Sequence, residues 1–286
     1  MTKQAQAGGT WGERLRIEPG RGLLDLAAIP TDATPGVADK LSAAELSSAT
    51  APSLAELQEK LFASSLYGGT RSVLLVLQGM DTAGKGGVVK RVAGSMDPQG
   101  VAHHAFKKPT EEELAHPFLW RVEKRLSAAG YVGIFDRSHY EDVLVPAVHG
   151  SIPAVDLAAR RDEINAFERR LVGAGTVVVK VLLHLGYDEQ RSRLLRRLDR
   201  PDKHWKFSTA DVDDRALWPR FQAAYAETIA ATSTSWAPWH VVPADRKWYS
   251  ALAVQQLLDE ALRGLDLEWP VAEYDVEEQR ARLLAT

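Results

Sequence analysis

A glycine-rich stretch that ends in a lysine is the part of the sequence best suited to chemistry. Gly79, Gly84 and Lys85 have the G-x-x-x-x-G-K spacing of a phosphate-binding loop. Glycine permits backbone angles that a Cβ atom would forbid, so successive N–H groups can turn toward one anion. Lys85 adds a full positive charge at the bound oxygens. We therefore expect phosphate to be bound by seven residues of this stretch: Gly79, Ala83, Gly84, Lys85, Gly86, Gly87 and Lys90.

The residues on either side predict the elements that position this loop. The apolar run 73–77 is short, rich in valine and leucine and soon followed by glycine, which favours a buried parallel strand. Helix-forming residues follow from Val88, so the loop opens onto a helix N-terminus, where the helix dipole also favours phosphate. A glycine-rich turn without a ligand is the alternative, but strand, spacing, lysine and helix together favour a phosphate-binding loop.

Two carboxylates are candidates for binding a metal ion. Most loops of this kind carry Ser or Thr after the lysine as a Mg²⁺ ligand, but this chain has Gly86. Asp81 inside the loop can replace that hydroxyl, because a carboxylate is a hard oxygen ligand. Asp136 directly follows the apolar run 130–135, which we predict as a strand. An aspartate after a strand is most often a turn residue or a helix cap, but beside a phosphate-binding loop it favours a second Mg²⁺ ligand.

Further polar residues follow the predicted strands. Arg137 carries a planar guanidinium suited to phosphate oxygens, and Glu141 is close enough in sequence to reach the same cleft. We interpret His139 as structural, because phosphoryl transfer needs no histidine. Lys107 follows the predicted strand 101–106 at the edge where open α/β sheets bind ligands. A solvated surface charge explains Lys107 equally well.

The most basic stretch of the chain lies at 191–206. A solvated helix face is one interpretation, since Arg193 and Arg197, four residues apart, would share one face of a helix. The nearby carboxylates Glu189, Asp199 and Asp202 do not balance the cations, and crowded cations repel one another unless an anion binds between them. We therefore expect a polyanion to bind here. The seven cations are Arg191, Arg193, Arg196, Arg197, Arg200, Lys203 and Lys206.

Bulk properties exclude several classes of protein. The chain has 286 residues, enough for one large α/β domain with arms. Its net charge of −3 does not indicate a nucleic-acid partner, and the lack of cysteine excludes disulfides, thiolate metal sites and a cysteine nucleophile. The N-terminus lacks an apolar signal region, and no apolar run approaches the ~20 residues that span a bilayer. We expect a cytoplasmic protein without a membrane partner.

The chain divides into an N-terminal extension, residues 1–50, and one domain, residues 51–286. Ser53 and Glu56 form a capping-box pattern that predicts the start of the domain's first helix. The pattern of apolar residues predicts five further elements: a helix over 111–129 that contains Arg121, a helix around Ile164, Phe167 and Leu171, strands at 176–183 and 239–243, and an amphipathic helix at 248–263.

Seven motifs, in the same order, resemble the polyphosphate kinase 2 family over roughly residues 40–275. They are Gly79–Lys85, Phe106–Thr110, Phe118–Arg121, Phe135–Ser138, Tyr140–Leu144, Lys203–Phe207 and Ala237–Trp248. That family transfers phosphoryl groups between inorganic polyphosphate and nucleotides with Mg²⁺. The resemblance implies an α/β phosphate-loop kinase fold with three α/β/α layers, a five-stranded parallel sheet and a helical lid, placed here at about 188–225. It also implies a homo-oligomer, a dimer or a tetramer.

The motifs resemble two branches of that family. Tyr140–Leu144 and Pro243–Trp248 look most like the branch that accepts both AMP and ADP. Gly86 and Asp136 are similar to the branch that mainly interconverts ADP and ATP. The expected activity is therefore phosphorylation of AMP, ADP or both by polyphosphate, with GMP and GDP as further acceptors.

The resemblance also implies a role for each candidate residue. Asp81 and Asp136 hold Mg²⁺, Lys85 and Arg137 bind the transferring phosphoryl group, and the lid cations hold the polyphosphate chain. Closing such a lid excludes water, which would otherwise hydrolyse the donor. The expected catalytic residues are Asp81, Lys85, Asp136, Arg137 and Arg197, and the acceptor nucleotide is expected at Lys107, Arg121, Arg137 and Glu141.

Two other functions are compatible with a phosphate-binding loop. An ATP-dependent nucleoside monophosphate kinase shares the fold and the Asp-Arg pair after the third strand, but it would not use polyphosphate. A nucleotide-binding switch without transferase activity would have no use for seven clustered cations. The donor therefore distinguishes the first alternative, and the basic stretch argues against the second.

Overall fold

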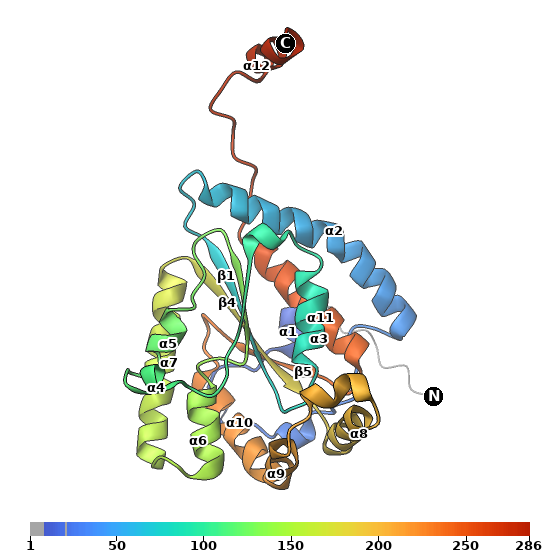
Figure 1. Cartoon of the computed structure of the whole chain (residues 1–286), viewed down its shortest axis with the longest axis vertical. Helices are drawn as coiled ribbons and strands as arrows, with labels where there is room; N and C mark the ends of the chain where they lie inside the picture. The colour runs from blue at the N-terminus through green and yellow to red at the C-terminus, as the bar shows by residue number, and fades with distance from the viewer. Residues whose placement is uncertain (1–8, 21) are drawn as a thin grey trace.

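The computed structural model describes residues 9–20 and 22–286, which are built around one parallel β-sheet (Figure 1). The strands lie in the order β2-β3-β1-β4-β5, so the first strand is central. This is the five-stranded parallel sheet that the resemblance implies. The strands are β1 (Ser72–Gln78), β2 (Val101–Ala105), β3 (Val132–Asp136), β4 (Thr176–His184) and β5 (Trp239–Pro243).

Strand β1 is buried along its whole length because helices cover both faces of the sheet. Alternate side chains of a strand point to opposite faces. Val73, Leu75 and Leu77 therefore join one hydrophobic core, while Leu74 and Val76 join the other. In the register between β1 and β3, Leu77 is opposite Asp136. The loops that follow these two strands consequently begin side by side at the same edge of the sheet.

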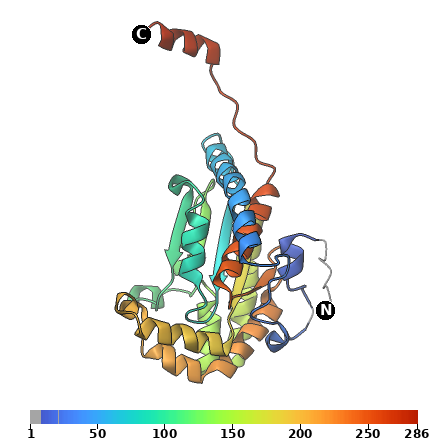
Figure 2. The same ribbon diagram turned by 90° about the vertical axis from the view of Figure 1, so that its right-hand side faces the viewer.

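Helices on the two faces complete a three-layer body, which the two perpendicular views show (Figures 1 and 2). One core is shared with α1 (Trp11–Leu15), α2 (Lys40–Ser65), α3 (Lys85–Ala93) and α11 (Lys247–Arg263). The other is shared with α5 (Trp120–Glu123), α6 (Glu141–His149), α7 (Ala154–Gly173) and α10 (Trp218–Thr232).

The segment predicted as a lid lies beyond the carboxyl ends of the strands. It contains α8 (Tyr187–Leu198), the 3₁₀ helix η3 (Pro201–Lys206) and α9 (Ala210–Ala216), and it ends within α10. Figure 1 shows α8 and α9 below the sheet, on the side where β5 ends. The basic stretch of the sequence is therefore carried to the sheet edge at which the phosphate-binding loop lies.

Two predicted helices are wrong in extent. Residues 111–129 form two short helices, α4 (Glu111–Leu114) and α5, because Pro117 disfavours helical angles at the residue before it. The helix expected from Ser53 is α2, which begins at Lys40 after the N-cap Asp39 and continues through Pro52. A buried hydrogen bond from Gln256 Nε2 of α11 to Thr50 Oγ1, 2.7 Å long, is one of the contacts that hold α2 on α11 next to Pro52.

The two ends of the described chain differ in how they contact the rest of the protein. Near the N-terminus, Ile17 donates a backbone hydrogen bond to Trp239 of β5, and Gly12 donates one to the carboxylate of Glu260. The predicted division at residue 50 falls inside α2. At the other end, α12 (Val276–Leu284) stands away from the body in both views (Figures 1 and 2). None of the described helices is both long enough and apolar enough to cross a membrane.

Candidate active site

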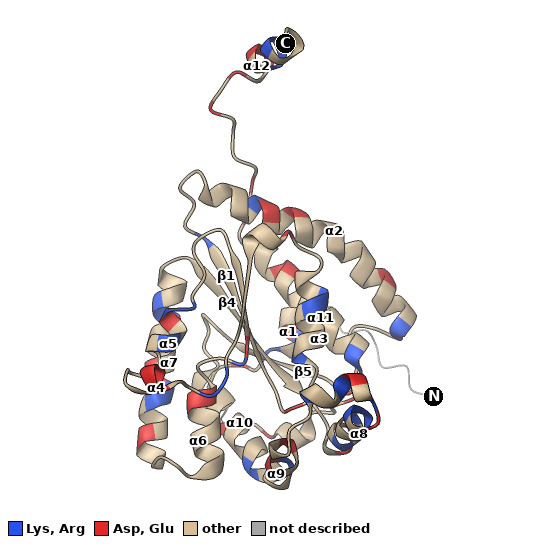
Figure 3. Cartoon of the chain, viewed as in Figure 1, with Lys and Arg blue, Asp and Glu red and all other residues tan. Residues whose placement is uncertain are grey.

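A cleft of about 1380 Å³ opens at the carboxyl edge of the sheet. The loops after β1, β2 and β3 form its floor, and the lid and the start of α11 form its walls. Twelve Lys or Arg residues line the cleft but only three Asp or Glu residues. Figure 3 shows Lys and Arg positions, in blue, gathered along the ribbon of α8. A cleft of this size and charge, in a chain whose net charge is −3, fits a large polyanion.

The loop between β1 and α3 has the geometry of a phosphate cradle. Gly79 and Gly84 have φ angles of +151° and +110°, which an L side chain rarely adopts. A Cβ atom at Gly79 would lie 2.8 Å from the carbonyl oxygen of Leu183, so the backbone of β4 also requires glycine there. Gly86 and Gly87 open the helix, and a Cβ atom at either would meet nothing within 4 Å. The helix N-terminus therefore faces open space in which an anion fits.

Lys85 is folded back over this loop. Its Nζ donates to the carbonyl oxygen of Gly79 at 2.7 Å, and the residue is only 9 % exposed. Burial lowers the pKa of Lys85, while the charge of Asp81 acts in the opposite direction. A desolvated ammonium held by a backbone carbonyl is poised to bind an anionic oxygen that enters the cleft.

Arg137 and Asp81 form an ion pair across the floor of the cleft. Arg137 Nη2 lies 2.8 Å from Asp81 Oδ1. Burial lowers the pKa of Arg137, but Glu141, Asp81 and Asp136 together raise it above the usual value. Arg137 also has a φ angle of +63°, which is uncommon for a residue with a side chain. The fold thus holds this guanidinium in place at the cost of local backbone strain.

The carboxylates of Asp81 and Asp136 fit a hard divalent cation. Both line the cleft beside the phosphate-binding loop, and β1 and β3 are neighbouring strands. Within residues 9–20 and 22–286 there is no group of three or more acidic or histidine side chains arranged to hold a metal ion. Mg²⁺ commonly uses one or two carboxylates and completes its shell with water and substrate phosphates, so two carboxylates are sufficient.

Glu141 is partly buried and does not line the cleft. It is the first residue of α6, and burial raises the pKa of its carboxyl group, an effect that Arg137 and Lys85 oppose. With the amide of Gln78 oriented to satisfy its neighbours, the Gln78 nitrogen donates to Glu141 Oε1 at 2.9 Å and its oxygen accepts from the Ser138 amide. Glu141 therefore adds a negative charge near Arg137 and Lys85 without lining the cleft.

The expectation that the basic stretch lacks partner charges is wrong. Six of its seven cations lie within 4 Å of a carboxylate, and they form ion pairs with four different carboxylates. Two of the four, Asp188 and Asp211, were not counted in the sequence argument. Lys206 lies over the Trp205 ring, 4.8 Å from its centroid. Residues 187–211 still hold seven Lys or Arg against five Asp or Glu, so the segment remains basic.

Arg193 differs from the other lid cations because its guanidinium is buried and fully bonded. Its Nη1 donates to the carbonyl oxygens of Thr82 and Ala83 in the phosphate-binding loop. Its Nη2 donates to those of Ala244 and Asp245 after β5, and its Nε donates to the Glu189 carboxylate at 2.7 Å. All five N–H donors are thus used within the protein. This geometry does not support the expectation that Arg193 binds polyphosphate directly.

The structure brings most of the predicted site residues together. Thirteen of them line the cleft, including Lys107 at the end of β2. Arg121 is instead buried, with Nη1 donating to the Lys107 carbonyl oxygen and Nη2 to Asp142 Oδ2 at 2.7 Å. Lys90 is exposed on α3, and the Gly79 carbonyl oxygen accepts a hydrogen bond from Lys85 Nζ. The predicted residues that do not line the cleft are Gly79, Lys90, Arg121 and Glu141.

Sequence reasoning also missed cations that the fold brings in from distant segments. Lys40 comes from the start of α2, Arg91 from α3 and Lys247 from the start of α11. Burial and the charges of Arg193 and Arg196 lower the pKa of Lys247. The position of Lys247 in the Ala237–Trp248 motif was a usable signal, whereas Lys40 lies in a segment with no recognised motif.

A parallel sheet with a phosphate-binding loop after its central strand and a basic lid over the carboxyl edge defines a phosphate-loop kinase. Residues 39–268 match the family model of polyphosphate kinase 2. The chain belongs to the polyphosphate kinase 2 family, as the motifs of its sequence predict.

Two curated relatives and one solved structure are similar over most of the chain. An AMP/ADP-polyphosphate phosphotransferase of Meiothermus ruber is 42 % identical over 262 residues, which cover 91 % of this chain and 96 % of that protein. An ADP-polyphosphate phosphotransferase of Rhodopseudomonas palustris is 38 % identical, covering 86 % and 88 %. The crystal structure of polyphosphate kinase 2 from Arthrobacter aurescens superimposes with a TM-score of 0.94 at 51 % identity, covering 97 % of this chain and 98 % of that chain.

Proposed function

We propose that this polyphosphate kinase transfers phosphoryl groups from inorganic polyphosphate to AMP and ADP. The observation that carries the proposal is the cleft, in which twelve Lys or Arg side chains surround a phosphate-binding loop. A nucleotide bears the charge of only a few phosphates, whereas polyphosphate bears about one negative charge on each phosphate along a long chain. Cations from the lid extend well beyond the loop, which suits the polymer better than it suits a second nucleotide.

The residues around the loop support a division of roles. Lys85 and Arg137 bind the transferring phosphoryl group, and Arg197 approaches it from the lid. Lys203 and Lys206 track the polyphosphate chain, and Lys107 lies on the acceptor side. Phosphoryl transfer requires chiefly that a protein position the reactants and neutralise their charge, and these side chains do both. The hydrogen bond from Arg121 to the Lys107 carbonyl indicates that Arg121 holds Lys107 in place for the acceptor nucleotide, and the charge of Glu141 favours the charged form of Arg137.

Mg²⁺ is the cation that we place at Asp81 and Asp136. When bound, it neutralises charge on the phosphate oxygens during transfer. Asp81→Asn should lower kcat by a factor on the order of 10²–10³ while leaving the melting temperature nearly unchanged. Titration of activity with Mg²⁺ provides the measurement, and Asp188→Asn, an exposed lid aspartate outside the cleft, is the matched control. Normal turnover of Asp81→Asn at ordinary Mg²⁺ would contradict this role.

The function is tested by offering purified protein polyphosphate and Mg²⁺ with AMP, ADP, GMP or GDP in turn. We expect ADP and ATP to form from AMP, and ATP from ADP. Parallel reactions with ATP as the donor and no polyphosphate distinguish a nucleoside monophosphate kinase. Transfer that needs ATP and ignores polyphosphate would overturn the proposal. Light scattering in the same buffers tests the predicted dimer or tetramer.

A further inference from the structure

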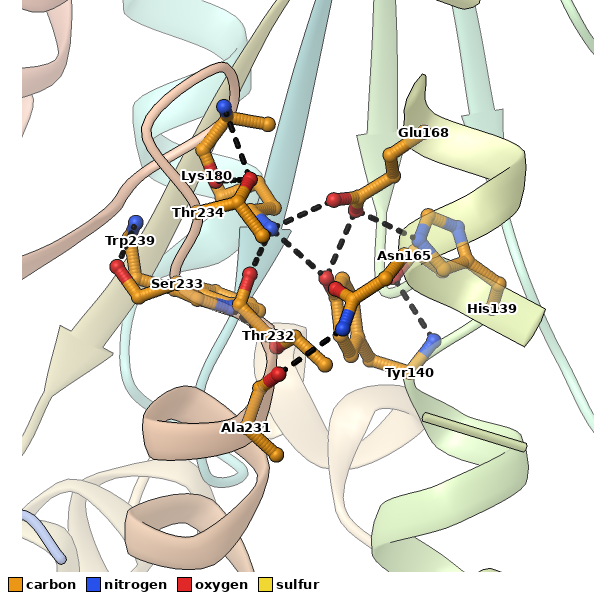
Figure 4. Close-up of polar contacts among 12 residues, drawn as sticks. His139, Tyr140, Asn165, Glu168, Lys180, Ala231, Thr232, Ser233, Thr234 and Trp239 are labelled. Carbon is orange, nitrogen blue, oxygen red and sulfur yellow. Dashed lines mark hydrogen bonds and ion pairs between the residues drawn. The ribbon is translucent and has the colours of Figure 1, made fainter. Parts of the chain in front are cut away.

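A buried polar cluster lies directly behind the active-site segment that runs from Asp136 to Glu141. Figure 4 shows its centre, where Lys180 of β4 and Glu168 of α7 meet. Both side chains are 0 % exposed, and Lys180 Nζ lies 2.6 Å from Glu168 Oε2. Nζ also donates to Tyr140 Oη at 3.0 Å and to the Thr232 carbonyl oxygen at 2.6 Å. Three acceptors around one ammonium match its three N–H groups.

The other oxygen of Glu168 holds the active-site segment. Tyr140 Oη donates to Glu168 Oε1 at 2.7 Å, and His139 Nε2 lies 3.2 Å from the same oxygen. Because a carboxylate oxygen only accepts, His139 carries its proton on Nε2. Both residues are fully buried and lie two and three positions after Arg137. One carboxylate therefore fixes the chain immediately beyond the strained residue.

The ionisation of the pair follows from its surroundings. Burial raises the pKa of Glu168, but Lys180 and His139 outweigh burial and lower it below the usual value. Burial lowers the pKa of Lys180, and the negative charge of Glu168 opposes this lowering. The negative charge of Glu168 is what makes it a strong acceptor for both His139 and Tyr140.

Stability alone does not explain a buried ion pair. Removing two charges from water is costly, and well-packed apolar residues often replace such pairs without loss of stability. A strained backbone residue, in contrast, persists only where its surroundings fix it. Arg137 is held on one side by its own N–H, which donates to Leu77 at 3.0 Å. The contacts of His139 and Tyr140 with Glu168 hold the chain on the other side.

We propose that the buried Lys180–Glu168 pair positions the Asp136–Glu141 segment and, through it, the Arg137 guanidinium and Asp136 carboxylate in the cleft. Neither Lys180 nor Glu168 lines the cleft, so both act as positioning residues. Lys180 orients the Glu168 carboxylate, and Glu168 holds His139 and Tyr140. The inference rests on the proposed phosphotransferase function, because its consequence is a change in turnover.

Two double variants separate positioning from stability. Lys180→Met with Glu168→Gln removes both charges but keeps an amide oxygen that accepts from Tyr140 and His139. Lys180→Met with Glu168→Leu removes both charges and the acceptor. We expect the Leu form to lower kcat by about 10–100-fold relative to the Gln form, with polyphosphate and nucleotide KM values changed much less. Circular dichroism at the assay temperature establishes the folded fraction of each.

Tyr140→Phe keeps the ring against Trp239 and removes only the hydroxyl, so it remains informative if the Leu form does not fold. It should lower kcat several-fold without altering KM. Gln256→Met removes another buried hydrogen bond, between α11 and α2, and should leave kcat unchanged. Equal kcat values for the Gln and Leu forms would overturn the inference. If the Leu form is unfolded, equal kcat values for Tyr140→Phe and the wild type would overturn it instead. An inactive wild type would instead contradict the proposed function.

Discussion

Two groups of ion pairs in this protein differ chiefly in their access to water. Lys180 and Glu168 are 0 % exposed, whereas Arg200 and Asp202 of the lid are 59 % and 57 % exposed. An exposed pair contributes about 0–1 kcal/mol, because water and salt compete for both partners. Breaking a buried pair leaves a charge without compensation and costs several times more. Exposed lid cations can therefore exchange a carboxylate for a phosphate at little cost, and buried ones cannot.

Arg193 shows that position in the sequence does not decide this difference. It lies between Arg191 and Arg196 on α8, yet its side chain is only 3 % exposed while theirs are 61 % and 55 % exposed. Three cations on one helix thus fall into two classes. Of the exposed members, Arg196 lines the cleft and is available to a substrate, whereas the buried member holds parts of the protein together.

The largest effect is expected from Lys180→Met alone. This change leaves Glu168 buried without its partner, so the free energy of unfolding should fall by about 3–5 kcal/mol. Urea denaturation provides the measurement. Adding Glu168→Gln to the same chain should restore part of the loss, because the uncompensated charge is gone. A loss below about 1 kcal/mol for the single change would mean that the cluster is as dispensable as a surface pair.

A smaller loss is expected from Arg193→Lys, which keeps the charge but not the fork of five donors. Lysine keeps the positive charge beside Glu189, so no buried charge is left without a partner, but its ammonium has three donors where the guanidinium has five. We expect the melting temperature and kcat both to fall, because the carbonyls of Thr82 and Ala83 belong to the phosphate-binding loop. Arg191→Lys on the same helix is the control, and equal behaviour of the two variants would contradict the distinction.

Replacing Lys203 and Lys206 together by Ala should alter binding rather than stability. We expect the polyphosphate KM to rise several-fold and the nucleotide KM to change little. The dependence of the polyphosphate KM on salt should weaken, since exposed charges act over about 8–10 Å at physiological ionic strength. Steady-state kinetics at increasing KCl provides the measurement. An unchanged polyphosphate KM and salt dependence would leave the phosphate-binding loop and Arg137 as the donor site.

The smallest effect is expected from Arg191→Ala. Arg191 pairs with Asp188, whose side chain is 83 % exposed, and Arg191 does not line the cleft. The free energy of unfolding should change by less than about 0.5 kcal/mol, and both KM values should stay close to those of the wild type. A clear rise in polyphosphate KM would extend the binding surface beyond the cleft.

Local signals in the sequence predicted most of the sheet and the floor of the site. Short apolar runs marked the strands, and the glycine spacing marked the phosphate-binding loop, because both depend on neighbouring residues. The helix through Pro52 and the break at Pro117 were missed, since packing and a single proline override periodicity. His139 was interpreted as structural, and its buried contacts with Glu168 agree with that.

The contacts of Arg193 and of the buried cluster could not be predicted in the same way. Arg193 bonds to carbonyls at Thr82 and Ala244, which lie 111 and 51 residues away. Which residues become partners over such distances depends on how the whole chain folds, and the neighbouring residues in the sequence do not reveal it. Lys180, in contrast, could have been recognised as a buried charge. It is the single lysine of the apolar strand Thr176–His184, and no solvent reaches a strand whose sheet is covered on both faces.

The bonding of Arg193 has a mechanical consequence for substrate entry. Four of its hydrogen bonds fasten the middle of α8 to the phosphate-binding loop and to the residues after β5. A swing of the whole segment 188–225 would break all of these contacts at once. An opening that keeps these four contacts would have to turn about the end of α8, at Asp199 and Arg200. Such an opening would move only the shorter piece that carries Lys203 and Lys206, would break the bonds of Arg197 to Lys206 and Asp211, and would leave the phosphate-binding loop in place.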